Sequence, residues 1–195
     1  SSRNESQLQL KQLIRTEAWH AIDMLNQSLS LYRMESGTFV LHAKPVDLVT
    51  TLTRVQQEML AAFPSRRLDL RLTGEDGSAA EANRYIAQGE EGLCYSLFGN
   101  LMRNAAEASR EGGCINVSFS IEPQNIVIAI RNAGQVPVTI RDRFFDKYVT
   151  VGKAHAPGLG TYSARLVTES QGGTIAMNTD EASDTTTVTV RLPKR

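Results

Sequence analysis

The chain has 195 residues, 41% of them hydrophobic, and its 21 basic residues are balanced by 21 acidic ones. This composition suits a globular unit with one substantial core plus an appendage, and the scattered Lys and Arg residues give no footprint for nucleic acid or an acidic membrane. No run is long enough to span a bilayer, no signal peptide is visible, and the chain begins without Met, so we expect a piece of a longer protein. Cys94 and Cys114 lack metal-type spacing and predict free thiols in a reducing compartment.

Residues 5–36 are predicted to form one long helix, since neither Gly nor Pro interrupts them before Gly37. Apolar residues recur along this stretch at the helical period, namely Ile14, Ala18, Ala21, Leu25, Leu29 and Tyr32. A helix this long and apolar usually pairs with another helix, either in cis or in a dimer. His20 has no acidic residue beside it, which favours a surface or packing role over a phosphorylated or ligand histidine.

The remaining elements are shorter and follow from periodicity and turn residues. Helices are predicted at residues 44–63, with Pro45 in the first turn, at 90–110, at 138–145, and from 158 to the Gly172-Gly173 pair. Strands are predicted at 38–42, 67–72, 85–87, 115–121, 126–130, 174–177 and 185–192, and the apolar 126–130 run should be central. Residues 146–157 lack an apolar period and predict a mobile loop. The fold class is therefore α+β, a two-layer sandwich with helices on one face of a mainly antiparallel sheet.

The helix at 90–110 carries an unusual polar pair. Its buried side is predicted to run through Leu93, Leu97, Leu101, Ala105 and Ala108. Asn100 and Asn104 lie one turn apart on this apolar helix, and Asn is a mediocre helix former, so the pair needs a reason. Either the two amides are hydrogen-bonded inside the core, or both carboxamide oxygens face a cation such as Mg²⁺. Phosphates and water would then complete the coordination shell of the cation.

A glycine loop, Gly158-Leu159-Gly160, opens the helix that follows the aperiodic stretch. Glycines let the backbone approach a ligand closely, and the free N–H groups at a helix start favour phosphate oxygens. Alone, such a loop is an ordinary helix start more often than a phosphate site. The order of features carries more weight: an N-x-x-x-N helix, a strand ending in N-x-G, a loop, and GLG opening a helix.

With these motifs in this order, the chain resembles the catalytic and ATP-binding domain of sensor histidine kinases, in the superfamily that includes gyrase and MutL and has the Bergerat fold. Residues 99–105 are similar to the N box, 132–137 to the first glycine box, 144–148 to the F box and 158–161 to the second glycine box. Residues 186–193 are similar to the last strand of the family. Residues 31–37 resemble the end of the second dimerisation helix. The resemblance implies a partial dimerisation domain at 1–37 and a catalytic domain at 38–195.

The same resemblance implies roles for individual residues. Asn104 would be the main Mg²⁺ ligand, with Asn100 beside it, and both are predicted to be catalytic. Asn132 would face the adenine amino group, and Thr186 would reach adenine through water. The triphosphate of ATP would be lined by Gly158, Leu159, Gly160 and Thr161, with residues 152–157 as a lid. The other expected nucleotide contacts are Arg103, Gly134, Tyr148 and Lys153, and for Lys153 a solvent-facing role is the plain alternative.

The residue at position 100 favours a kinase over a water-using ATPase. In the hydrolysing relatives, a Glu one turn before the Mg²⁺ asparagine activates water, and Asn100 occupies that place. An amide cannot take a proton at neutral pH. Phosphoryl transfer needs mainly positioning and charge neutralisation, so the site suits a nucleophile from elsewhere, such as a neutral histidine.

The chain departs from the family pattern around the site. Asn132 replaces the carboxylate that usually reads adenine, so that contact carries no charge. Val136 follows Gln135 where the first glycine box has its second glycine. Ala156-Pro157 replaces glycines before the GLG loop, which should stiffen the lid hinge.

No histidine of the chain carries the acceptor motif of the family, since His20, His42 and His155 lack the following acid and downstream Pro. We therefore expect the acceptor helix N-terminal to Ser1. The first hypothesis is a cytoplasmic histidine kinase domain, joined to a membrane only through other parts. Its partners would be its own acceptor helix, a second protomer and a response regulator. The alternative is a catalytically degenerate nucleotide-sensing or scaffold module that acts through helix-mediated dimerisation.

Overall fold

The computed structural model describes residues 28–150 and 158–194, and the chain divides into two units, residues 1–39 and 40–195. In the first unit, residues 28–35 are helical. Gly37 follows with a φ of +68°, and the Thr38 N–H donates to the Arg33 carbonyl over 2.9 Å, which ends the helix. The rest of the predicted long helix, including His20, lies outside the described residues. Among the described residues, no helix has the length and hydropathy needed to cross a bilayer.

The second unit begins with a strand that the sequence placed wrongly. Residues 38–43 have no regular structure, and the strand is β1 (Lys44–Asp47), which pairs antiparallel with β3 (Ile86–Gly89). Pro45 therefore lies in a strand and not in the first turn of a helix. The helix α2 (Leu48–Ala62) starts after Asp47, whose carboxylate accepts from the Val49 N–H over 3.1 Å. Local pattern misplaced the strand because its pairing partner lies some forty residues further along the chain.

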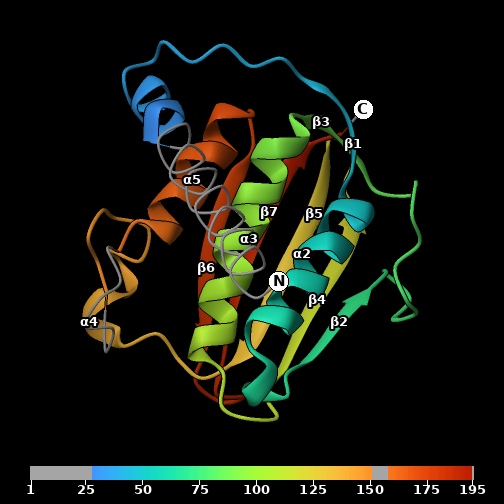
Figure 1. The fold of residues 1–195 in the computed structure, drawn as a ribbon, viewed down its shortest axis with the longest axis vertical. Coiled ribbons are helices and arrows are strands. Elements are labelled where there is room, and N and C mark those ends of the chain that lie inside the picture. The colour runs from blue at the N-terminus through green and yellow to red at the C-terminus, as the bar shows by residue number, and fades with distance from the viewer. Residues whose placement is uncertain (1–27, 151–157, 195) are drawn as a thin grey trace, which may run out of the picture. The chain divides into compact units, whose positions relative to one another are not determined.

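A five-stranded sheet forms the floor of this unit (Figure 1). Its order is β2 (Asp69–Thr73), β4 (Cys114–Ile121), β5 (Asn125–Ala133), β7 (Thr185–Pro193) and β6 (Thr174–Asp180). β2 pairs parallel with β4, and the other three pairings are antiparallel. The predicted mixed, mainly antiparallel sheet is confirmed, and the apolar strand β5 is central as expected.

Three helices, α2, α3 (Glu91–Ala108) and α5 (Gly160–Ser170), lie side by side on one face of this sheet (Figure 1). The core lies between the layers, where α3 buries Leu97, Leu101 and Ala105. Ala108 does not continue this buried side as expected, because it lies exposed in the last turn. The two-layer α+β class is confirmed.

The short elements connect these layers. The turn η1 (Pro64–Arg66) follows α2 and brings the Arg66 guanidinium to the C-terminal end of α3. There it donates to the carbonyls of Ala106, Glu107 and Ser109 over 3.3, 3.2 and 2.5 Å. A cation at this end satisfies free carbonyls and complements the helix dipole. The predicted helix at 138–145 is shorter, since α4 (Val138–Arg141) gives way to turns.

Both cysteines are free thiols in the structure, as their spacing predicts. Cys114 is exposed at the start of β4, whereas Cys94 is buried on α3. Burial raises the pKa of the Cys94 thiol from 9.0 to about 12, because the thiolate would lose its hydration.

Candidate functional site

A pocket opens between the C-terminal half of α3 and the strands β5 and β7. It brings together four of the predicted site residues, Asn104, Asn132, Gly134 and Thr186. Its apolar walls and rim are Leu101, Ala105, Ala108, Ile130, Gln135, Val136, Phe144 and Val188. An apolar pocket with a few convergent polar groups is the usual form of a small-molecule site. The exposed Ala108 thus has a place in this wall.

The polar floor of the pocket is built by strand pairing. Asn132 on β5 and Thr186 on β7 are directly opposite each other, and the two residues are 8% and 6% exposed. The Asn132 amide nitrogen donates to the Ala133 carbonyl over 2.8 Å, and the Thr186 hydroxyl donates to the Gly134 carbonyl over 2.8 Å. Each side chain donates a hydrogen bond to a backbone carbonyl, so the Asn132 amide oxygen and the Thr186 hydroxyl oxygen remain as acceptors. This floor suits a ligand group that donates.

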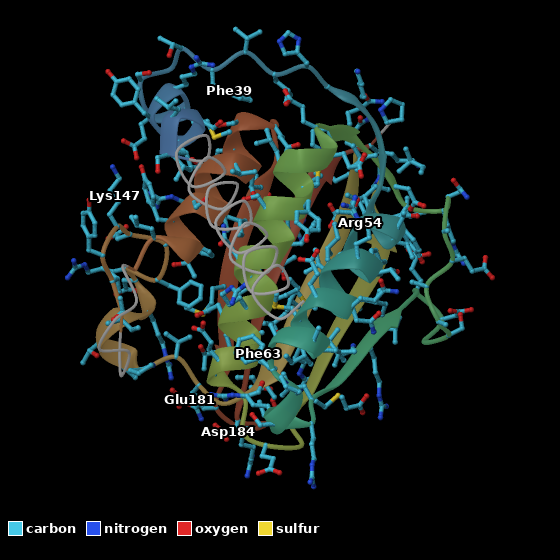
Figure 2. The ribbon with its side chains drawn as sticks, in the orientation of Figure 1. Phe39, Arg54, Phe63, Lys147, Glu181 and Asp184 are labelled. Carbon is cyan, nitrogen blue, oxygen red and sulfur yellow. The ribbon has the colours of Figure 1, made fainter. Side chains whose placement is uncertain are left out.

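The turn after β5 shapes one rim. Gly134 has a φ of +97° and its N–H donates to the Asp184 carbonyl over 2.8 Å, which joins it to the turn between β6 and β7. Figure 2 labels Glu181 and Asp184 in that turn. Val136 takes the place of the missing second glycine, and its buried side chain lines the pocket. Arg141 holds this rim, since it donates to the Val136 carbonyl and to the Gln135 amide oxygen over 2.9 and 3.1 Å. The departure at position 136 therefore adds an apolar wall.

The glycine loop ends where α5 begins. Gly158 has a φ of +67°, and its carbonyl accepts from the Tyr148 N–H over 3.0 Å. A Cβ at Gly158 would lie 2.8 Å from the Tyr148 carbonyl carbon, so both conformation and space require glycine. α5 starts at Gly160 without a side-chain cap, and the first N–H groups of a helix have no partner within it. This turn therefore has the backbone form of an anion site.

Side chains of the first turn of α5 attach it to the loop before it. The Thr161 hydroxyl donates to the Phe144 carbonyl over 2.8 Å. The Tyr162 ring contacts two cations, the Lys147 ammonium at 4.9 Å from the ring centre and the Arg165 guanidinium at 5.6 Å. Figure 2 shows Lys147 on the loop that follows α4. The Thr161 hydroxyl thus donates to the protein backbone, and the group that Thr161 can offer a ligand is its backbone N–H.

The two asparagines of α3 occupy different surroundings. Asn104 lines the pocket, whereas Asn100 lies where α3 meets α5. The Asn100 amide nitrogen donates to the Ser163 hydroxyl over 3.4 Å, and its amide oxygen lies 3.9 Å from the position of a Cβ on Gly160. Ser163 is 8% exposed. No sequence pattern indicated Ser163, because a serine within a helix becomes a partner for Asn100 only when the two helices meet.

Other predicted contacts lie apart from this pocket. Arg103 is exposed on α3, and Tyr148 is 73% exposed with a φ of +64°. Neither lines the pocket formed by residues 28–150 and 158–194. Leu159 is at the N-cap position of α5, next to the glycines. Lys153, His155 and the lid segment 152–157 with Ala156-Pro157 lie outside the described residues.

Known proteins resemble this chain in sequence. The family model "Histidine kinase-, DNA gyrase B-, and HSP90-like ATPase" matches residues 89–195, more than half of the chain. The alginate biosynthesis sensor protein KinB of Pseudomonas aeruginosa is 28% identical over 171 residues, which are 86% of this chain and 28% of KinB. The sensor histidine kinase ZraS of Escherichia coli is 29% identical over 187 residues, 95% of this chain and 37% of ZraS. The chain thus spans about a third of these relatives.

Solved structures share the fold. The mycobacterial sensor histidine kinase MprB matches with a TM-score of 0.67 at 21% identity, over 78% of this chain and 98% of that one. Full-length ShkA in complex with AMPPNP matches with a TM-score of 0.72 at 18% identity, over 92% of this chain and 37% of ShkA. The match of the family model over residues 89–195 shows that the chain belongs to the histidine kinase-, DNA gyrase B- and HSP90-like ATPase family.

Proposed function

We propose that the chain is the ATP-binding catalytic domain of a two-component sensor histidine kinase. It binds MgATP in the pocket between α3, β5 and β7 and transfers the γ-phosphoryl group to a histidine outside these 195 residues. The observation that carries the proposal is the meeting of Asn104, Asn132 and Thr186 in one pocket, to whose residue Phe144 the first turn of α5 is joined by the Thr161 hydroxyl. The sensor proteins among its relatives and the AMPPNP held by ShkA support it.

In this proposal the floor of the pocket reads the base. Its two acceptors, on Asn132 and Thr186, match the exocyclic amino group of adenine, which donates. Because Asn132 is neutral, this contact has the strength of an ordinary hydrogen bond and lacks the gain of a charged one. The apolar walls, including Val136 and Phe144, cover the ring.

The other end of the site would hold the phosphates. The N-terminal turn of α5 offers N–H groups at Leu159, Gly160 and Thr161 to phosphate oxygens. The residues fit a Mg²⁺ ion, because the Asn100 amide oxygen lies 3.9 Å from where a Cβ of Gly160 would stand. The Asn100 amide nitrogen donates to Ser163 and leaves that oxygen to bind a cation. Asn104 and Asn100 would hold the ion. When bound, Mg²⁺ neutralises charge on the phosphates.

The chemistry available to these residues fits transfer better than hydrolysis. Phosphoryl transfer depends on positioning and on neutralised charge, and the amide at position 100 cannot serve as a general base. The chain would then bind the nucleotide, orient its phosphates and exclude water until the acceptor arrives. That acceptor would lie on a helix paired with residues 1–37, in the same protein or in a second protomer, and a response regulator would receive the phosphoryl group. We assign residues 1–37 to the dimerisation domain and 38–195 to the catalytic domain, placed in the cytoplasm.

A calorimetric titration with ADP and a non-hydrolysable ATP analogue, with and without Mg²⁺, tests the proposal. We expect saturable binding that Mg²⁺ strengthens and that Asn104→Ala removes. The matched control is Asn178→Ala, the same change on the exposed edge strand β6, which should bind as the unaltered chain does. Absence of binding by the folded, unaltered chain would overturn the proposal and leave the degenerate scaffold, which the neutral Asn132 and the altered lid sequence favour.

A further inference from the structure

Ser163 is a buried polar residue outside the sequence motifs at 99–105, 132–137, 144–148 and 158–161. It lies one turn into α5, where its backbone N–H donates to the Leu159 carbonyl over 2.8 Å. The residue is 8% exposed and its side chain faces α3, where its hydroxyl accepts from the Asn100 amide nitrogen over 3.4 Å. A buried hydroxyl on an interface between two helices requires a partner, and Asn100 supplies one.

The contact matters because an amide has two different ends. The nitrogen of Asn100 can only donate, and its oxygen can only accept or bind a cation. With the nitrogen bonded to Ser163, the oxygen is turned toward Gly160, 3.9 Å from where a Cβ would stand. An apolar residue at position 163 would leave the half-buried N–H without this acceptor, and such a loss disfavours the orientation.

We propose that Ser163 is a positioning residue that holds the Asn100 carboxamide with its oxygen toward the N-terminal turn of α5. This inference rests on the proposed function, in which that turn receives the phosphates and Mg²⁺. Ser163 itself touches neither group; it acts through Asn100. It also couples α5 to α3, so the glycine turn and the asparagine pair keep a fixed relation.

The first experiment needs no nucleotide. In ¹⁵N-edited NMR spectra of the 195-residue chain, the side-chain NH₂ resonances of Asn100 should shift in Ser163→Ala and return toward their original positions in Ser163→Thr, which keeps the hydroxyl. The matched control is Ser170→Ala on the same helix, whose hydroxyl donates to the Leu166 carbonyl over 2.7 Å and should leave Asn100 unchanged. Unchanged Asn100 resonances in Ser163→Ala would overturn the contact.

The second experiment measures the gain in ADP affinity that Mg²⁺ provides. Ser163→Ala should lower affinity roughly 3- to 10-fold with Mg²⁺ and leave it unchanged without Mg²⁺, the effect expected for one net hydrogen bond. Ser163→Thr should restore most of it. An equal loss with and without Mg²⁺, or none, would overturn the positioning role while the proposed function stands. If the unaltered chain binds no nucleotide, the proposed function fails and this inference falls with it.

Discussion

The two ends of the proposed site, the pocket at β5 and β7 and the glycine turn of α5, are built in different ways. At the β5–β7 end, Asn132 and Thr186 are placed by a continuous strand ladder, and each spends its donor on a neighbouring backbone carbonyl. At the α5 end, the glycine turn is placed by separate contacts: Tyr148 with Gly158, and Asn100 with Ser163. The first end is fixed by the sheet, whereas the second depends on helices and loops that meet through single bonds.

This difference indicates that the two ends respond differently to substitution. A ladder of backbone hydrogen bonds fixes register, so the acceptors of the floor are set once the sheet folds. Contacts between separate elements can change one at a time. We therefore expect substitutions at the β5–β7 end to act on every adenine ligand, and substitutions at the α5 end to act only on ligands that carry phosphates. Adenosine and ADP separate the two cases.

Among the substitutions that compare the two ends of the site, Asn132→Ala should have the largest effect. Removing a buried acceptor leaves the donor of the ligand unpaired, at about 1–3 kcal/mol, so the affinities for adenosine and ADP should both fall by roughly 5- to 150-fold. Calorimetric titration of both ligands measures this. Asn132→Asp keeps an acceptor and should retain binding of both. A loss confined to ADP would contradict the assignment of this end to the base.

A smaller and more selective effect is expected from Gly158→Ala. The added Cβ would approach Tyr148 to 2.8 Å at a φ of +67°, and left-handed strain alone costs about 1–2 kcal/mol. ADP should weaken roughly 10-fold, while adenosine affinity stays constant. Gly77→Ala is the control, because Gly77 has a φ of +78° with nothing within 4 Å of a Cβ. An equal loss of affinity for adenosine and ADP would contradict the assignment of the glycine turn to the phosphates.

Arg66→Ala should leave both ligands almost unaffected and reduce stability instead. Three carbonyls at the C-terminal end of α3 lose their cationic donor, and we expect the free energy of unfolding to fall by about 1–2 kcal/mol in urea denaturation. The matched control is Arg67→Ala, because the neighbouring Arg67 makes an exposed ion pair with Glu111 at 3.9 Å. It should change the free energy of unfolding little. An ADP affinity that fell in step with stability would show that this cap supports the site directly.

The cysteines should show the smallest effect on binding. Burial raises the Cys94 pKa from 9.0 to about 12, so at pH 8 an alkylating reagent should label exposed Cys114 alone and leave ADP affinity unchanged. Because the folded pKa exceeds the unfolded one, the stability linked to this thiol is complete below about pH 9 and is lost as pH rises toward 12. Mass spectrometry checks the labelling, and Cys94→Ala should flatten this alkaline loss. Labelling of Cys94 in the native chain at pH 8 would contradict its burial.

The sequence predicted most elements of the fold, since periodicity and turn residues are local. The strand at β1 was misplaced, however, and the parallel pairing of β2 with β4 was not foreseen. Both depend on partners distant in the chain, which local pattern does not encode.

For the candidate site, the sequence alone determined the motif order, the spacing of Asn100 and Asn104 on one helix, and the glycine turn at α5. Only the tertiary structure decided which of these meet: Asn104 joins Asn132 and Thr186 in the pocket, while Asn100 turns to Ser163. Spacing along a helix fixes which face a residue occupies, because the helical period is set by the backbone. What that face contacts depends on packing between elements far apart in the sequence, and it is this packing that placed Ser163 beside Asn100.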